Sequence, residues 1–489
     1  MNKRPLFLKQ YAILGLVCFL ACVGYLAYSL YEAGLGFPLD DAWIHQTFAR
    51  NFADSFTWSF QLGQPSGGST GPIWGFLLSG LYLLGIQAVW GTHFIGFLLL
   101  WGCSIVGYQL GRKLLTESKG PPIVFGVLIA LEWHLVWSAL SGMETLLLVL
   151  AAMLIFSWLL DNRNDWWIPG VLTGIMIWVR PDGITLLGPI MLSLLLRKEK
   201  FKSKVRYGAV YLVCVMIFAG FYFGFNQIIT GDFWPNTFYA KQAEYAILRE
   251  TSIAIRYGNL AKQILTGVGI VLFPGLARET LDIYRRKDWE RFAMLLWAVG
   301  YVGIYAWRLP VAYQHGRYII PALPVLIILS ANGMAGWLDL RSKKTWYRVL
   351  STVWAGAAAA VLVVFYGLGA RAYGLDVGVI ETEMVKVARW VKDNTPSGAV
   401  IAAHDIGGLG YYGERQIIDM AGLISPEVIP FIRDQDLLSA FLDENDVDYL
   451  VTFPDWYPEL VKELQLVYSS GGEYSEIFGS EKMSVYLWK

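Results

Sequence analysis

The chain has 489 residues, of which 55% are hydrophobic and only 16% are charged, and its mean hydropathy is +0.45. So small a share of charged residues excludes an ordinary soluble globular protein and indicates an integral membrane protein. Because 39 basic residues balance 39 acidic ones, partners that bind through a broad basic surface, such as nucleic acids, are not expected.

The predicted elements begin with an apolar run at 11–31, which is long enough to cross a bilayer as a helix. It follows three basic residues, Lys3, Arg4 and Lys9, so we interpret it as a retained first span with its basic end in the cytoplasm. Further apolar runs lie at 72–90, 92–111, 121–139, 145–160, 166–179, 183–196, 207–226, 261–280, 292–307, 318–338 and 347–370.

One of these runs is not expected to cross the membrane, because otherwise the basic clusters after residue 111 would fall on the opposite side from the N-terminus. The weakest is 72–90, which is interrupted by Gly75, Gly80 and Gly85. We interpret it as a re-entrant or interface-lying element. The sequence therefore predicts a polytopic α-helical membrane domain of about eleven spans over residues 1–370, with the C-terminus outside.

Residues 371–489 differ in composition, since charged residues become frequent and the apolar runs become short. The pattern predicts a soluble α/β domain. Its helices are expected at 380–393, 434–444 and 456–464, and its strands at 400–403, 448–453, 465–469 and 483–488.

Two adjacent carboxylates, Asp40 and Asp41, open the polar segment after the first span. Behind them Ile44, Phe48 and Phe52 recur at four-residue steps, which predicts an amphipathic helix lying at the membrane interface. A role as helix N-cap explains one carboxylate. The other fits a general base or a metal ligand, and the residues alone leave the two interpretations open.

Other loops predicted on the outer side also carry charged residues. Each has an ordinary explanation: Glu144 as an acid at a helix start, Arg180 and Asp182 as a local salt bridge, and Arg317 as an anchor at the membrane surface. Lys241 follows an aromatic loop and could reach a lipid phosphate. A functional site is favoured because all of these residues are predicted on the same side.

Six segments of the chain, taken in order, carry a family resemblance. They are Asp40–Asp41, Ser69–Trp74, Ser141–Thr145, Arg180–Gly183, Pro235–Lys241 and His315–Pro324. Together they resemble the GT-C class of polyprenyl-phosphate-sugar-dependent glycosyltransferases, most closely the bacterial branch that contains the terminal arabinofuranosyltransferases of mycobacterial cell walls. Protein O-mannosyltransferases and aminoarabinose transferases are more distantly similar. Segments 405–412 and 418–423 are also similar to segments of that branch.

The resemblance implies an inverting transfer of a sugar from a polyprenyl-phosphate carrier to an acceptor hydroxyl group at the outer face of a bacterial cytoplasmic (inner) membrane. The acceptor would belong to a glycan, a lipid or a protein. Asp40 corresponds to the expected base, and Asp41 beside it would orient that base, hold the sugar or cap the helix.

The resemblance also implies how the remaining residues divide. The donor phosphate is expected to bind to Lys241, His315, Arg317, Tyr318 and Arg180. Glu144, Asp182 and His45 are assigned to the substrate or to a divalent cation. The need for a metal stays open, because the Asp-x-Asp motif of some relatives is absent.

The main alternative is a transporter or flippase for a lipid-linked sugar. Such proteins place ionisable groups near mid-membrane, often on a matching pair of broken helices. No such pair is visible, and Glu132 and His134 are predicted toward the outer end of their span. A non-catalytic scaffold is a further alternative. Within the C-terminal domain, Gly407–Gly410 lacks the spacing of a dinucleotide-binding turn, so a structural or acceptor-contacting role is expected there.

Overall fold

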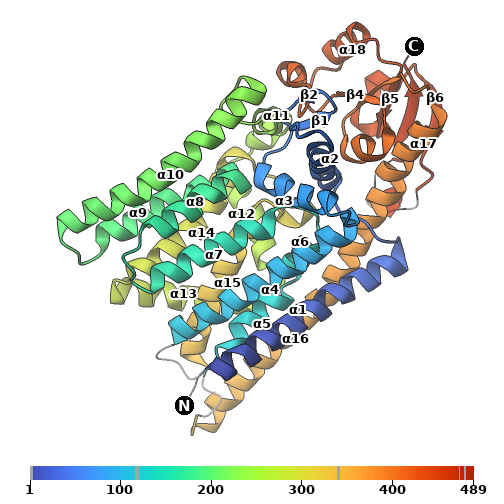
Figure 1. Ribbon diagram of the computed structural model, residues 1–489. Helices are drawn as coiled ribbons and strands as arrows, with labels where there is room; N and C mark the ends of the chain where they lie inside the picture. The colour runs from blue at the N-terminus through green and yellow to red at the C-terminus, as the bar shows by residue number, and fades with distance from the viewer. Residues whose placement is uncertain are drawn as a thin grey trace.

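The computed structural model describes residues 4–115, 120–338, 342–472, 474–477, 479 and 481–488. An elongated bundle of helices carries a smaller domain with a β-sheet at one end (Figure 1). The helices of the bundle and its loops are α1 (Arg4–Glu32), α2 (Asp40–Ser55), α3 (Pro72–Leu83), α4 (Ala88–Leu114), α5 (Ile123–Leu131), α6 (Trp133–Leu140), α7 (Thr145–Leu160), α8 (Trp167–Val179), α9 (Leu187–Leu196), α10 (Phe201–Thr230), α11 (Asn236–Glu244), α12 (Ile253–Leu265), α13 (Val268–Arg286), α14 (Trp289–Arg308), α15 (Leu323–Trp337) and α16 (Thr345–Val379).

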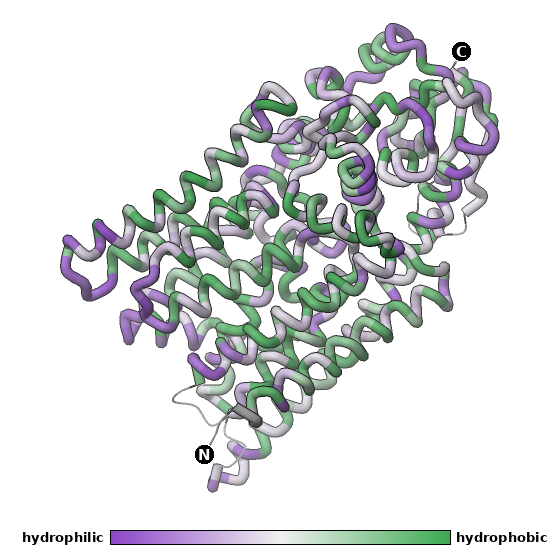
Figure 2. The backbone as a smooth tube through the Cα atoms, viewed as in Figure 1, coloured by the Kyte–Doolittle hydropathy of each residue, from purple (hydrophilic) through white to green (hydrophobic). Residues whose placement is uncertain are grey.

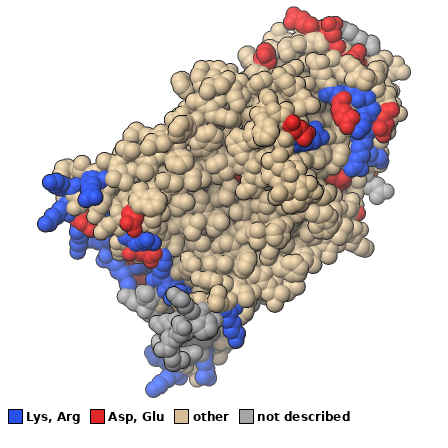
Figure 3. Space-filling model, in the orientation of Figure 1, with Lys and Arg blue, Asp and Glu red and all other residues tan. Residues whose placement is uncertain are grey.

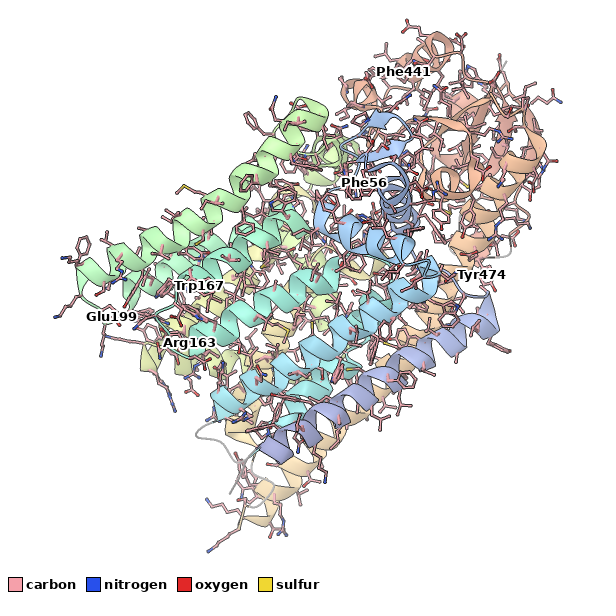
Figure 4. All side chains as sticks on the ribbon, viewed as in Figure 1. Phe56, Arg163, Trp167, Glu199, Phe441 and Tyr474 are labelled. Atoms are coloured by element: carbon pink, nitrogen blue, oxygen red, sulfur yellow. The ribbon has the colours of Figure 1, made fainter. Side chains whose placement is uncertain are left out.

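Hydrophobic residues dominate the bundle, whereas the sheet domain is mixed (Figure 2). Lysine and arginine gather at the end of the bundle away from that domain, and a broad belt of the visible face carries few charges (Figure 3). Arg163 and Glu199 lie at the basic end, and Phe441 marks the opposite end (Figure 4). This distribution is the one expected of a membrane protein whose basic loops face the cytoplasm.

The predicted number of about eleven spans is not confirmed. Among the described residues, five helices are long and apolar enough to cross a membrane, or seven if each of two bent helix pairs counts as one span. Several other predicted runs are helical but short. For example, α7 has 16 residues and reaches about 24 Å at a rise of about 1.5 Å per residue, against a hydrocarbon core of about 30 Å.

The structure contains two bent helix pairs, whereas the sequence showed no matching pair of broken spans in the two halves of the chain. The chain bends by 58° between α5 and α6 and by 110° between α12 and α13. Trp133 at the first bend donates a hydrogen bond from Nε1 to the carbonyl oxygen of Thr266 at the second, over 2.8 Å. The first bend contains no proline; Glu132 ends α5 and caps α6 by accepting from Leu135 N. The sequence therefore reads as an unbroken apolar run there.

Helix α3 is the short element that was predicted not to cross the membrane. It packs on α2, and Gly71 before it packs against the carbonyl oxygen of Val179 and the side chain of Glu144. After α3 the chain turns directly into α4, where Thr92 accepts a hydrogen bond from Gln46 of α2 over 2.8 Å. Near the end of α3, Tyr82 donates a hydrogen bond to the hydroxyl of Tyr411 of the sheet domain over 3.2 Å, so this end lies beside that domain.

We expect cysteine labelling to report this arrangement. In a background without the four native cysteines, Gln87→Cys and Asp455→Cys should react with an impermeant thiol reagent from the same side of the membrane, because both positions are exposed. Glu199→Cys, also exposed, should react from the other side. Labelling of Gln87→Cys together with Glu199→Cys would mean that the chain crosses the membrane between α2 and α4.

The C-terminal domain contains a five-stranded sheet of order β4-β3-β5-β7-β6. The pairs β3–β4 and β3–β5 are parallel, whereas β5–β7 and β6–β7 are antiparallel. Its strands and helices are β3 (Val400–Ala403), β4 (Gln416–Asp419), β5 (Tyr449–Thr452), β6 (Gln465–Ser469), β7 (Ser484–Leu487), α17 (Lys386–Asn394), α18 (Gln435–Glu444), α19 (Pro458–Val461) and α20 (Tyr474–Ile477). A separate two-stranded ribbon follows α2 and consists of β1 (Ser59–Gln61) and β2 (Gln64–Pro65).

Most of the predicted elements of this domain are present, with three differences. Strand β4 and helix α20 were not predicted. The helix predicted at 456–464 is reduced to Pro458–Val461, because Pro458 can only begin a helix. Helix α16 continues from the bundle across residue 371, where the domain boundary is predicted, to Val379.

Helix α2 does not lie on the membrane as predicted. Every residue from Ala42 to Ala49 is buried, and the indole of Trp43 packs on Tyr411 and Tyr412 of the C-terminal domain with ring centroids 4.8 and 4.9 Å apart. Its apolar residues are covered by protein instead of lipid. Helix α2 therefore lies at the junction of the two domains.

Candidate active site

A cavity of about 1020 Å³ lies between the bundle and the C-terminal domain. A second cavity, of about 260 Å³, lies deeper among the helices and is lined by Glu144, Arg180 and Asp182. Four residues line both cavities: Leu39, Asp41, Lys241 and Arg317. A substrate that filled both cavities would therefore pass this charged group.

Asp41 forms the centre of a partly buried ionic cluster. Its Oδ2 lies 2.6 Å from Arg317 Nη2 and 3.7 Å from Lys241 Nζ. Both cations also donate hydrogen bonds to the hydroxyl of Tyr318, over 3.0 and 3.1 Å. Burial alone would raise the pKa of Asp41, but Arg317 and then Lys241 hold it below its usual range. The carboxylate is therefore ionised and paired at neutral pH.

Arg317 keeps unused hydrogen-bonding capacity in this cluster. The side chain is buried, with 9% of the residue exposed, and its Nε and Nη1 atoms have no partner among the described residues. Buried donors without a partner are costly, since each loses its hydration. Arg317 is therefore poised to bind an anion that supplies the missing acceptors.

Asp40 faces the other way, toward the C-terminal domain. Its two carboxylate oxygens accept hydrogen bonds from the backbone N–H groups of Gly407 and Gly408, over 2.6 and 2.8 Å. The N-cap of α2 is Leu39, so the interpretation of one carboxylate as the N-cap is wrong. Burial and then the nearby carboxylate of Asp405 raise the pKa of Asp40 despite the two N–H donors.

Glu144, His45, Arg180 and Asp182 lie together, as their common predicted side suggested. Glu144 lies 3.3 Å from His45 Nε2 and 3.8 Å from Arg180 Nε, and Arg180 pairs with Asp182 over 3.1 Å. The hydroxyls of Tyr301 and Tyr305 also donate to Asp182. The two tyrosines were not predicted, because each occurs in an ordinary aromatic stretch of a helix.

These contacts do not suit the divalent cation that was left open. Glu144 lies beside His45 and Arg180, and Asp182 Oδ2 is engaged by Arg180 and two tyrosine hydroxyls, while Glu144 Oε2 and Asp182 Oδ1 have no hydrogen-bond partner among the described residues. Within the described part of the chain, no group of three or more His, Cys, Asp or Glu side chains could hold a metal ion. The donor set therefore fits polar contacts to a substrate better than metal coordination.

His315 does not join the ionic cluster around Asp41. Its Nε2 lies 2.7 Å from Oδ2 of Asp376 on α16, which also accepts from Trp137 Nε1 over 2.9 Å. The backbone at His315 is left-handed, with φ of 57°, a conformation that costs energy for a residue other than glycine. His315 lines the large cavity at a separate point, where α16 fixes its orientation.

A third group of polar residues comes from the C-terminal domain and was not predicted. His404 and Asp405 follow the end of β3, and both line the large cavity. His404 binds the hydroxyl of Tyr457 through Nδ1, over 2.7 Å, and its Nε2 lies 3.5 Å from Glu244 of α11. The only sequence signal was their position at the carboxyl end of a predicted strand, where sites often form in α/β layers.

Gly407 permits the two domains to approach closely. A Cβ atom there would overlap the backbone carbonyl oxygen of Asp40 and lie 2.7 Å from its Oδ2. We expect Gly407→Ala to weaken docking by about 1–3 kcal/mol, seen as a lower melting temperature and faster hydrogen exchange in α2. Gly398→Ala, where a Cβ meets nothing within 4 Å, is the matched control. Equal melting temperatures for the two variants would contradict this close contact.

Comparison with known proteins places the fold. ArnT from Cupriavidus metallidurans bound to undecaprenyl phosphate is similar at a TM-score of 0.60 and 14% identity, over 97% of both chains. The apo form of that protein is similar at a TM-score of 0.62 and 13% identity, over the same shares. The Archaeoglobus fulgidus oligosaccharyltransferase, in complex with Zn and sulfate, is similar at 0.60 and 11% identity, over 91% of this chain and 69% of the other. Both proteins are glycosyltransferases of the GT-C type, and the chain shares that fold.

Sequence comparison adds one match. Residues 376–486 match a family described as a domain of unknown function (DUF8728). No curated protein matches the chain. The matched segment contains Asp405, Gly407 and Gly408 and corresponds closely to the sheet domain.

Proposed function

We propose that this chain, which has the fold of GT-C glycosyltransferases, transfers a sugar from a polyprenyl-phosphate carrier to an acceptor hydroxyl group. The observation that carries the proposal is the cluster of Asp41, Lys241 and Arg317 at the meeting point of two cavities. In such a donor the phosphate stands between the lipid and the sugar. If these two parts occupy different cavities, the phosphate lies where the cavities meet, and Lys241 and Arg317 supply cations there.

The donor phosphate is assigned to Arg317 and Lys241. Arg317 can bind it through Nε and Nη1, the atoms that lack partners, while Nη2 keeps its contact with Asp41. Tyr318 holds both cations in place. Arg180 lines the deeper cavity, where it could contact the sugar or the phosphate.

The reaction requires one displacement at the anomeric carbon. The acceptor oxygen forms a bond to that carbon, the bond from the carbon to the phosphate oxygen breaks, and the electron pair stays on the phosphate. Arg317 and Lys241 stabilise the leaving phosphate. The proton of the acceptor hydroxyl passes to Asp40, whose raised pKa suits a base working near neutral pH. A single displacement inverts the anomeric centre.

The chemistry is assigned to the outer face of a bacterial inner membrane, with the C-terminal domain on that side. Support comes from the basic residues gathered at the opposite end of the bundle (Figure 3). Because the motif order resembles the terminal arabinofuranosyltransferases, a pentose donor is the first to test. The acceptor, whether glycan, lipid or protein, would approach through the large cavity beside the C-terminal domain.

One observation favours a second candidate, a transporter of a lipid-linked sugar. Two bent helix pairs meet within the bundle, and the first bend carries the buried pair of Glu132 and His134, 2.8 Å apart. Broken helices with ionisable residues are typical of transporters. The charged groups that line both cavities instead favour an enzyme, because they lie at the domain junction.

Incubation of the purified protein in lipid nanodiscs with a panel of polyprenyl-phosphate pentoses and hexoses tests the proposal. With a cell-envelope extract as acceptor, wild-type protein should release free polyprenyl phosphate from one donor and label the extract with its sugar. Release from no donor by folded protein would contradict the enzyme. Movement of intact lipid-linked sugar across proteoliposomes would then favour the transporter.

A further inference from the structure

Asp405 is an acidic side chain of the C-terminal domain whose charge acts on the proposed base, Asp40. It lies in the loop after β3, two residues before Gly407, whose N–H binds Asp40. It also lines the cavity of about 1020 Å³ that Asp40 and Asp41 line. Its Oδ2 is buried and has no hydrogen-bond partner among the described residues.

A buried carboxylate oxygen without a hydrogen-bond partner destabilises the fold. A purely structural role for Asp405 does not explain this cost. Two other carboxylates of this region do have hydrogen-bond partners: Asp40 accepts from two backbone N–H groups, and Asp419 accepts from the N–H groups of Ala421, Leu423 and Ile424. Asp405 Oδ2 instead remains available to a donor that enters the cavity.

Asp405 and Asp40 interact electrostatically, and several other titratable groups act on Asp405. His404 faces it from its own loop, Asp419 from the sheet, Glu244 from α11, and Asp41 from α2. Burial and then Asp405 raise the pKa of Asp40, and burial raises the pKa of Asp405 against the opposing effect of His404. Two carboxylates that interact in this way keep a proton between them more readily than either would alone.

We propose that Asp405 is a second catalytic carboxylate, which acts with Asp40 as a pair on the acceptor hydroxyl group. The inference rests on the proposed function and adds to it that the C-terminal domain completes the active site. The pair begins with one proton and one negative charge. The acceptor hydroxyl donates its hydrogen bond to Asp405, its proton passes to the pair as the oxygen bonds to the anomeric carbon, and the leaving phosphate takes the electron pair. The pair afterwards returns one proton to water.

Asp405→Asn tests the proposal against Asp455→Asn, a neutralised exposed carboxylate of the same domain. With the donor and envelope extract on which wild-type protein acts, kcat of Asp405→Asn should fall about 10²-fold or more. The Kd for undecaprenyl phosphate and the melting temperature should match those of Asp455→Asn. The acid limb of residual activity should move to lower pH, because Asp40 loses a neighbouring negative charge.

Transfer by Asp405→Asn within threefold of Asp455→Asn would overturn the proposal. If Asp405→Asn unfolds, Asp405→Glu decides: it keeps the charge, so its acid limb should stay in place while kcat falls about tenfold or more because the carboxylate is displaced. Wild-type kcat in a folded Asp405→Glu would also overturn it. Absence of transfer by wild-type protein would instead refute the proposed function, so the two failures are distinguishable.

Discussion

Asp40→Asn is expected to reduce sugar transfer by about 10² to 10⁴-fold, because a general base typically contributes that much to the rate. Donor binding should change little, since the phosphate is assigned to Arg317 and Lys241, which pair with Asp41. Initial rates of polyprenyl phosphate release, together with the Kd for undecaprenyl phosphate, separate the two effects. The acid limb of wild-type kcat should lie above the ordinary carboxyl range near pH 4, because a base with a raised pKa is protonated and inactive below it.

Two controls make this result interpretable. Asp54→Asn removes an exposed carboxylate from the same helix and should transfer at the wild-type rate. The amide of Asp40→Asn keeps one acceptor oxygen for the loop at Gly407 but turns an NH₂ group toward the other N–H donor, so a stability loss of about 1–3 kcal/mol is expected. Transfer within threefold of the wild-type rate would mean that Asp40 is not the base.

Arg317→Ala is expected to raise the Kd for undecaprenyl phosphate by about 10 to 100-fold, which corresponds to the loss of charge-assisted hydrogen bonds worth about 1.5–3 kcal/mol. The variant also leaves Asp41 with Lys241 alone, at 3.7 Å, so the pKa of Asp41 should rise toward its usual range. Direct binding of undecaprenyl phosphate in nanodiscs measures the first effect.

The matched control is Arg249→Ala. Arg249 is exposed, lies shortly after helix α11, which carries Lys241, and lines neither cavity. It should bind the lipid as the wild type does. Arg317→Lys should restore only part of the affinity, because an ammonium group lacks the planar set of donors that a guanidinium offers. If Arg317→Ala binds as tightly as Arg249→Ala, the phosphate is held elsewhere.

The sequence predicted which residues face one side, but not which of them meet. Asp41, Lys241 and Arg317 were each placed outside by loop charge and topology, and the structure brings them into one cluster. The different contacts of Asp40 and Asp41 could not be predicted, because Asp40 binds backbone N–H groups 367 and 368 residues away in the sequence. Asp405 was missed because one acid after a strand is common and its significance depends on the opposing helix.

In the fold, too, features set by the local sequence could be predicted, and features set by contacts between distant segments could not. Four strands of the C-terminal domain were predicted because short apolar runs bounded by turns are a local signal. The burial of α2 was not, because an apolar face that packs on protein has the same composition as one that lies in lipid. The bend at Glu132 was hidden for a related reason: the carboxylate that caps the new helix is a single polar residue within an apolar run.

The continuous helix α16 has a consequence for any attempt to separate the two domains. A truncation at residue 370 would cut that helix nine residues before its end at Val379 and remove Asp376, the partner of both His315 and Trp137. An isolated C-terminal fragment would in turn expose the surface of Tyr411 and Tyr412 that Trp43 covers. We therefore expect the membrane part and the sheet domain to stabilise each other and to unfold together.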